Sequence, residues 1–211
     1  DNSRVKTFPL VTYLLVGANI AMWLLQLQGG EEFTGGFSFV PDEISSGREL
    51  AGTSTVFLND RSIASPQYVG PSPIWLTIFT AMFMHGSWMH IIGNMLYLHI
   101  FGDQIEDDLG HLKFLVFYLV AGVAATLAQL AVDPHSTIPC LGASGAVAGV
   151  LGAYLLRHPY NRVRVLIIRQ VADVSAVGGI GFWVLLQFVG EMGSAVGSPD
   201  GIAAFALDRR S

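Results

Sequence analysis

Ser144 opens a run of small residues that could place a nucleophile at the start of a helix. The apolar stretch from Ser144 to Leu156 would make a helix of about 20 Å, too short to cross a bilayer core of about 30 Å unaided. We therefore expect Ser144 to lie below the outer surface and to be preceded by non-helical backbone, which is tolerated at that depth only beside protein or a water-filled cavity. Water and helix N-terminal amides suit a serine nucleophile and its oxyanion.

The same run also has a purely structural interpretation. Gly145 and Gly149 lie one helical turn apart, with Gly152 close to the same face, and small residues let membrane helices approach closely. On spacing alone, the alternative that Ser144 bonds back to a carbonyl within a packing seam is favoured. The short length of the helix is the argument against it.

His90 and Asn94 are four residues apart, so they share one face of a helix. Polar side chains in a membrane segment are costly unless they face the bundle interior or a cavity. On an inward face, these two could donate hydrogen bonds to a developing oxyanion. The alternative is a structural hydrogen bond between helices. His85 is expected to cap or order the outer end of the segment, and a metal site is not favoured because His85, His90 and His99 do not share one helical face.

The acidic stretch that follows, Phe101-Gly102-Asp103-Gln104-Ile105-Glu106-Asp107-Asp108-Leu109-Gly110-His111, is predicted to be a solvated turn on the opposite side from Ser144. Glu106 is expected to bond backbone groups of adjoining helix ends. We therefore predict a structural role for it.

Composition points to a membrane environment for the elements that carry these residues. Of 211 residues, 52% are hydrophobic and 13% are charged, against about 25% charged in soluble domains. No charge falls within residues 11–30, 67–102, 114–132 or 134–156. The lack of a basic block argues against nucleic-acid binding. The single cysteine, Cys140, excludes an intrachain disulfide and a cysteine-based zinc site, and we predict no cofactor and no metal.

The hydrophobic pattern predicts an all-α polytopic membrane protein with a single domain over residues 1–211. Its helices are expected at about 10–27, 74–101, 114–132, 143–156 and 174–190, with a partial helix at 201–207 and a long outer loop at 28–72.

The distribution of basic residues predicts the orientation, because cytoplasmic loops are enriched in Lys and Arg. With the N-terminus inside, the outer segments hold only Arg48 and Arg61, and the other nine of the 11 basic residues lie inside. We therefore expect a multi-pass protein of the cell membrane with a cytoplasmic N-terminus.

Together these stretches resemble the rhomboid family of intramembrane serine proteases. His85, His90 and Asn94 match its His-x-x-x-x-His-x-x-x-Asn pattern, the acidic turn follows, and Gly142 to Gly145 match its Gly-x-Ser-Gly pattern. The resemblance implies a six-helix bundle in which Ser144 is the nucleophile. It also implies that His90 and Asn94, with the Ser144 backbone amide, stabilise the oxyanion.

The sixth helix departs from the family pattern, which resembles Gly-x-Ala-x-x-Ala-His and supplies the base of a Ser–His dyad. Residues 201–206 fit its approach, but Leu207 stands at the histidine position and the chain ends at Ser211. We therefore expect an incomplete last helix and a chain that is inactive by itself, since a serine without a base is a weak nucleophile.

Two functions follow as expectations. The first is an intramembrane endopeptidase that cleaves transmembrane segments of other membrane proteins within the lipid bilayer. The second, favoured by Leu207, is a non-catalytic rhomboid-like protein that binds or escorts membrane helices. A small transporter or channel is a third class, suggested only by polar residues at membrane depth.

Overall fold

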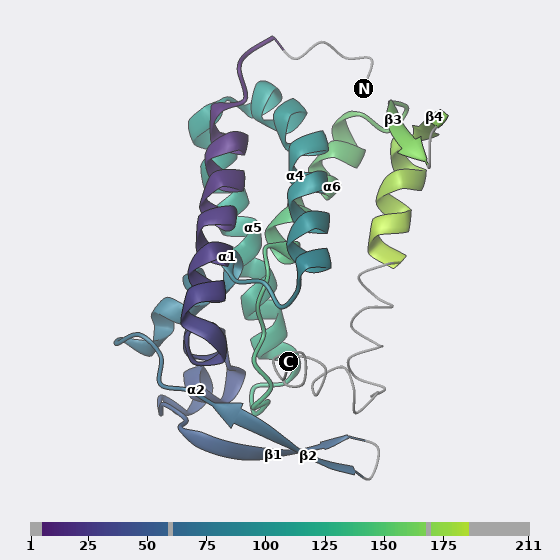
Figure 1. Cartoon of the computed structure of the whole chain (residues 1–211). Helices are drawn as coiled ribbons and strands as arrows, with labels where there is room; N and C mark the ends of the chain where they lie inside the picture. Colours follow the sequence, from purple (N-terminus) through teal and green to yellow (C-terminus); the bar gives the residue numbers. More distant parts are fainter. Residues whose placement is uncertain (1–5, 59–60, 168–169, 186–211) are drawn as a thin grey trace. The chain divides into compact units, whose positions relative to one another are not determined.

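The computed structural model describes residues 6–58, 61–167 and 170–185 (Figure 1). The chain divides into two compact units. The larger holds Arg4–Ser54 and Ala64–Arg157, and the described parts of the smaller are 55–58, 61–63, 158–167 and 170–185.

The larger unit is a helical bundle. Its long helices are α1 (Leu10–Gly36), α4 (Trp88–Leu109), α5 (His111–Val132) and α6 (Ser144–Arg157). α1 packs against α4 and α5, and α6 packs against both α4 and α5, as Figure 1 shows. Among the described residues, α1 and α5 are long and apolar enough to cross a membrane, and Ile74–Phe83, Ser144–Arg157 and Ala176–Leu185 are shorter apolar helices.

The described chain is mostly helical, as predicted, but the helices differ from the expected ranges. α1 continues past the predicted end at 27, with a kink at Gly30 (φ 68°, ψ −155°). Of the range 174–190, residues 176–185 are helical, the first two belong to a strand and the rest lie outside the described residues. The partial helix expected at 201–207 also lies outside them.

The largest difference concerns the continuous helix expected over 74–101. The structure has instead the 3₁₀ turns η1 (Ile74–Leu76) and η2 (Ala81–Phe83) on either side of α3 (Thr77–Thr80), then extended backbone, and then α4. Ser87 explains the new start, because its side chain accepts the His90 N–H at 3.1 Å and so caps α4. The helix therefore begins at Trp88, and His85 precedes it. The other end differs too: α4 continues to Leu109, so most of the stretch that was predicted to be a solvated turn is helical, and Glu106 in it is buried.

The range expected to be a long outer loop, 28–72, contains regular structure. It holds the end of α1, the short helix α2 (Pro41–Ser46), and strands β1 (Gly52–Leu58) and β2 (Arg61–Gln67), which form a two-stranded sheet. In the smaller unit, β3 (Arg162–Ile167) pairs antiparallel with β4 (Gln170–Ser175). The all-α prediction did not include these hairpins.

The α5–α6 interface is built from small residues. A Cβ added at Gly149 would lie 2.5 Å from the Ala121 Cβ, and one added at Gly145 would collide with Ala125. The two helices approach so closely that neither position leaves room for a side chain. This close packing holds the start of α6, and with it Ser144, against the bundle.

Candidate functional site

His90 and Asn94 lie one turn apart in the first half of α4. Asn94 is fully buried. The His90 Nε2 and both polar side-chain atoms of Asn94 are buried and have no hydrogen-bond partner within the part of the chain that the structure describes. Buried polar groups are nearly always paired, so this concentration of unpaired atoms is a mark of a site that is completed by water or a ligand.

Ser144 is the first residue of α6 and is partly buried. The preceding backbone is not helical: Gly142 has a φ of 130°, and its N–H donates to the Ala81 carbonyl at 2.8 Å. Ser144 therefore stands where an extended segment enters a short apolar helix.

Gly142 lies where the His90 side chain of α4 and the start of α6 meet. A Cβ added there would lie 2.7 Å from both Cε1 and Nε2 of His90 and 3.5 Å from the Ser144 Oγ. The imidazole and the hydroxyl thus border the same small space beside the glycine. Both the close approach and the positive φ require glycine at this position.

His85 is fully buried in the extended segment between η2 and α4. Its ring packs edge-on to the His90 ring, with centroids 5.2 Å apart. Its backbone is held by Gln26 of α1, whose Oε1 accepts the His85 N–H at 2.9 Å and whose Nε2 donates to the His85 carbonyl at 2.9 Å. His85 was expected to cap or order the outer end of this segment. It lies against the His90 ring there, and the cap of α4 is Ser87.

Sequence reasoning missed Gln26 and Ser87. Gln26 is a polar residue in an apolar helix, which is a signal for a buried hydrogen bond. Ser87 is a preferred N-cap residue that follows glycine in an otherwise apolar run.

Glu106 lies near the other end of α4 and is fully buried. Its Oε1 accepts the Val11 N–H at 2.8 Å, and its Oε2 accepts the Thr12 N–H and the Thr12 hydroxyl, each at 2.7 Å. His111 Nδ1 lies 2.5 Å from Oε1. Pro9 provides no side-chain cap for α1, so the Glu106 carboxylate occupies the free amides of its first turn. The structure does not bring Glu106 together with Ser144.

Within the described residues, the histidines are not part of a group that could hold a metal ion. His99 packs against Tyr13, with ring centroids 5.8 Å apart, and the described residues contain no group of three or more His, Cys, Asp or Glu arranged to hold a metal.

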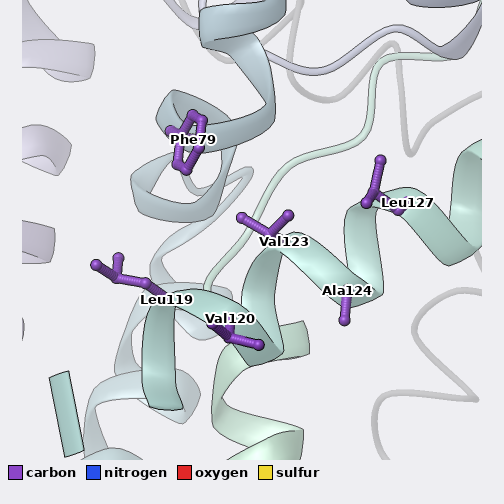
Figure 2. A pocket seen from close by; sticks show the side chains of 6 residues that line it. All are labelled: Phe79, Leu119, Val120, Val123, Ala124 and Leu127. Carbon is purple, nitrogen blue, oxygen red and sulfur yellow. The ribbon is translucent and has the colours of Figure 1, made fainter. Parts of the chain in front are cut away.

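A separate groove of about 310 Å³ lies between α3 and α5. As Figure 2 shows, the side chains that line it are all hydrocarbon: Phe79, Leu119, Val120, Val123, Ala124 and Leu127. It contains no group that could perform acid–base or nucleophilic chemistry.

Comparison with known proteins shows which family the chain resembles. Residues 72–206 match the model of the rhomboid domain. The chain is 35% identical over 100 residues to rhomboid-like protein 11, chloroplastic, of Arabidopsis thaliana, which covers 47% of this chain and 35% of the relative. It is 30% identical over 139 residues to the rhomboid protease GluP of Bacillus subtilis, covering 64% of this chain and 27% of the relative.

A third relative is the putative rhomboid protease YdcA of Bacillus subtilis, 26% identical over 115 residues, with 54% of this chain and 56% of the relative covered. The matches to these three relatives thus span between 27% and 56% of their lengths. No solved structure matches the chain.

Proposed function

The chain belongs to the rhomboid family, and on that premise we propose that it is an intramembrane serine endopeptidase that cleaves membrane-spanning segments of other membrane proteins. The observation that carries the proposal is the meeting of Ser144 and His90 at Gly142. Extended backbone, a helix start and a partly buried imidazole with a buried Nε2 converge there, and these features suit the nucleophile and the oxyanion of acyl transfer.

In this proposal the Ser144 Oγ loses its proton to a base and attacks the carbonyl carbon of the scissile peptide. The C–N bond then breaks, and the amine product leaves with that proton, so that an acyl-enzyme remains. Water hydrolyses this ester, which releases the carboxylic acid product and restores the Ser144 hydroxyl. His90 and Asn94, together with the Ser144 backbone N–H, stabilise the oxyanion. Support for their role comes from the His90 Nε2 and the Asn94 amide, which have no competing partner among the described residues. Donors free of other bonds need little reorganisation when charge develops.

The supporting residues act on geometry. Gly142 leaves room for the His90 ring, and Gly145 and Gly149 let α6 approach α5. His85 packs against His90, and Glu106 joins the far end of α4 to the start of α1.

The mechanism also needs a general base, and this chain has no histidine at the position where the family pattern places one. The family pattern implies a histidine at the position of Leu207, which lies outside the described residues. A leucine side chain cannot accept the Ser144 proton, so we expect a chain carrying Leu207 to be weakly active or inactive. Leu207→His is the change that supplies the missing group.

We further propose that the protein is multi-pass in the cell membrane with a cytoplasmic N-terminus, as the basic residues indicate. The end of the bundle that carries Ser144 then faces the opposite side, and water reaches the site from there.

The test uses a membrane-anchored reporter in proteoliposomes. We expect Leu207→His to cleave it, and the same chain with Ser144→Ala to lose at least a hundredfold in rate. Ser46→Ala is the matched control, because this serine is exposed on α2. Cleavage that survives Ser144→Ala would reject the assignment of the nucleophile.

Leu207 also supports a second candidate, a non-catalytic rhomboid-like protein that binds or escorts membrane helices. It predicts that the reporter copurifies uncleaved with the native chain. It also predicts that a fluorophosphonate does not label Ser144 even in Leu207→His. Labelling of Ser144 in that variant favours the protease.

A further inference from the structure

The connection from α5 to α6, residues 133–143, leads into Ser144 and is held in place mainly by residues 39–67, which precede α3. The bonds from that range are Ser45 Oγ to Pro134 O at 2.6 Å, Asp42 N to Ser136 O at 3.0 Å, Gln67 Nε2 to Thr137 O at 2.9 Å, Ser54 Oγ to Thr137 Oγ1 at 3.2 Å, and the mutual pair of Phe39 and Cys140 at 2.9 and 2.7 Å. A further bond joins Gly142 N to the Ala81 carbonyl of η2 at 2.8 Å. Only one of these partners is a buried side chain: Gln67.

Gln67 is the last residue of β2, and it bonds to the connection across 70 residues of sequence. A glutamine amide nitrogen carries two hydrogens. Its two nearest acceptors are the Ser54 Oγ and the Thr137 carbonyl, each at 2.9 Å, with the Ser65 Oγ at 3.1 Å. Gln67 therefore ties both strands of the first hairpin to the backbone of Thr137.

The hairpin itself does not require the bond to Thr137, because its strands pair through their own backbones. The bond instead adds a fixed point upstream of Cys140 and Gly142, which have fixed points of their own. Fixed points at 137, 140 and 142 set the register of the connection. A slip would move Gly142 from its place against His90 and open a gap beside the Ser144 Oγ.

We propose that Gln67 is a positioning residue for Ser144: through the Thr137 carbonyl it holds the connection in the register that sets Gly142 between Ser144 and His90. The inference rests on the proposed function. It gives a strand residue of the larger unit a part in positioning the nucleophile.

Cys140 is a built-in reporter of this effect, since it is the only cysteine of the chain and lies within the connection. Its alkylation rate by N-ethylmaleimide reports opening of the connection and requires no catalysis. We expect Gln67→Met to raise that rate about fivefold, the factor that corresponds to one lost hydrogen bond. Gln28→Met is the matched control, because Gln28 is exposed on α1, and it should leave the rate unchanged.

Gln67→Glu tests whether the effect comes from loss of the hydrogen bond to the Thr137 carbonyl or from a change in side-chain shape, because glutamate and glutamine have nearly the same shape. At pH 8 its carboxylate cannot donate to the Thr137 carbonyl, so the alkylation rate relative to the native chain should rise as in Gln67→Met. At pH 5 the protonated fraction can donate, and the ratio should fall towards one. This return also shows that the variant is folded.

Reporter cleavage tests the link to Ser144. In the Leu207→His background, Gln67→Met should lower kcat about fivefold and leave KM unchanged. Cys140 alkylation that does not change in Gln67→Met or in Gln67→Glu at pH 8 overturns the proposal, and so does an unchanged kcat. Absence of any cleavage in Leu207→His would reject the proposed function instead, while the alkylation comparison still decides whether Gln67 holds the connection.

Discussion

In the first half of α4, His90 Nε2 and both polar atoms of Asn94 are buried with no hydrogen-bond partner among the described residues, whereas near the end of the same helix both oxygens of the buried Glu106 are occupied. One helix thus carries two buried polar regions, one with its hydrogen bonds made and one without partners among the described residues. Its Glu106 end joins α4 to α1, and its His90 end leaves hydrogen-bonding capacity open beside Ser144.

The two regions differ in what they do for the fold. A satisfied buried carboxylate stabilises the bundle and is costly to disturb, whereas an unsatisfied buried amide lowers stability. Proteins retain such costly groups mainly where function needs them. The contrast therefore supports a site at the His90 end and a structural anchor at the Glu106 end, and opposite mutational effects should follow.

We expect the strongest loss of stability when the anchor at Glu106 is removed. Glu106→Ala leaves the Val11 and Thr12 amides without their acceptors at the start of α1. We expect it to lower the free energy of unfolding by about 3 kcal/mol, measured in mixed detergent micelles. Glu106→Gln keeps one acceptor oxygen and should lose about half as much. A loss below about 1 kcal/mol for Glu106→Ala would contradict the anchor role.

We expect Gly142→Ala to cause the second largest loss of stability, because it strains the backbone between His90 and Ser144. The added methyl group would meet the His90 ring, and a φ of 130° is unfavourable for alanine. We expect a loss of about 2 kcal/mol in unfolding free energy. Gly152→Ala is the matched control: a Cβ there has nothing within 4 Å, so helix propensity should raise stability by up to about 1 kcal/mol. Equal effects of the two changes would argue against the close contact.

Asn94→Leu should have the opposite sign to Glu106→Ala. Leucine has the same branched skeleton of four side-chain heavy atoms, and it removes a buried amide that lacks a partner among the described residues. We expect the unfolding free energy to rise by about 1 kcal/mol, while the cleavage rate of a Leu207→His chain falls. Asn94→Ala should instead lose stability, since it leaves a cavity. A destabilised Asn94→Leu would mean that the amide contributes to the fold rather than to the reaction.

From the sequence we could predict which residues belong to these two regions, but not which distant residues they contact. The four-residue spacing of His90 and Asn94 and the small residues after Ser144 were visible as patterns. The contact of Gly142 with His90 was not, because it joins residues more than 50 positions apart. The break before α4 was hidden by a long apolar run, although Ser87 carried a capping signal.

The two hairpins were missed for different reasons. β1 and β2 lie in a range rich in Gly, Ser and Pro, which is typical of a loop. β3 alternates Arg162-Val163-Arg164-Val165, a period-two pattern of a strand, but its arginines were assigned to a basic inner loop. In both cases a charge or composition signal outweighed local periodicity.

Asp107 should give the smallest effect, because it makes hydrogen bonds to the start of the chain like those of Glu106 but at positions exposed to solvent. It accepts the Thr7 N–H at 2.9 Å, the Thr7 hydroxyl at 2.6 Å and the Lys6 N–H at 3.3 Å, all at exposed positions. Water can replace these bonds when the chain unfolds or the side chain changes, so Asp107→Asn should leave Tm within about 1 °C of the native value. A shift in Tm close to that of Glu106→Gln would show that the number of hydrogen bonds, rather than their burial, sets the strength of the α1–α4 anchor.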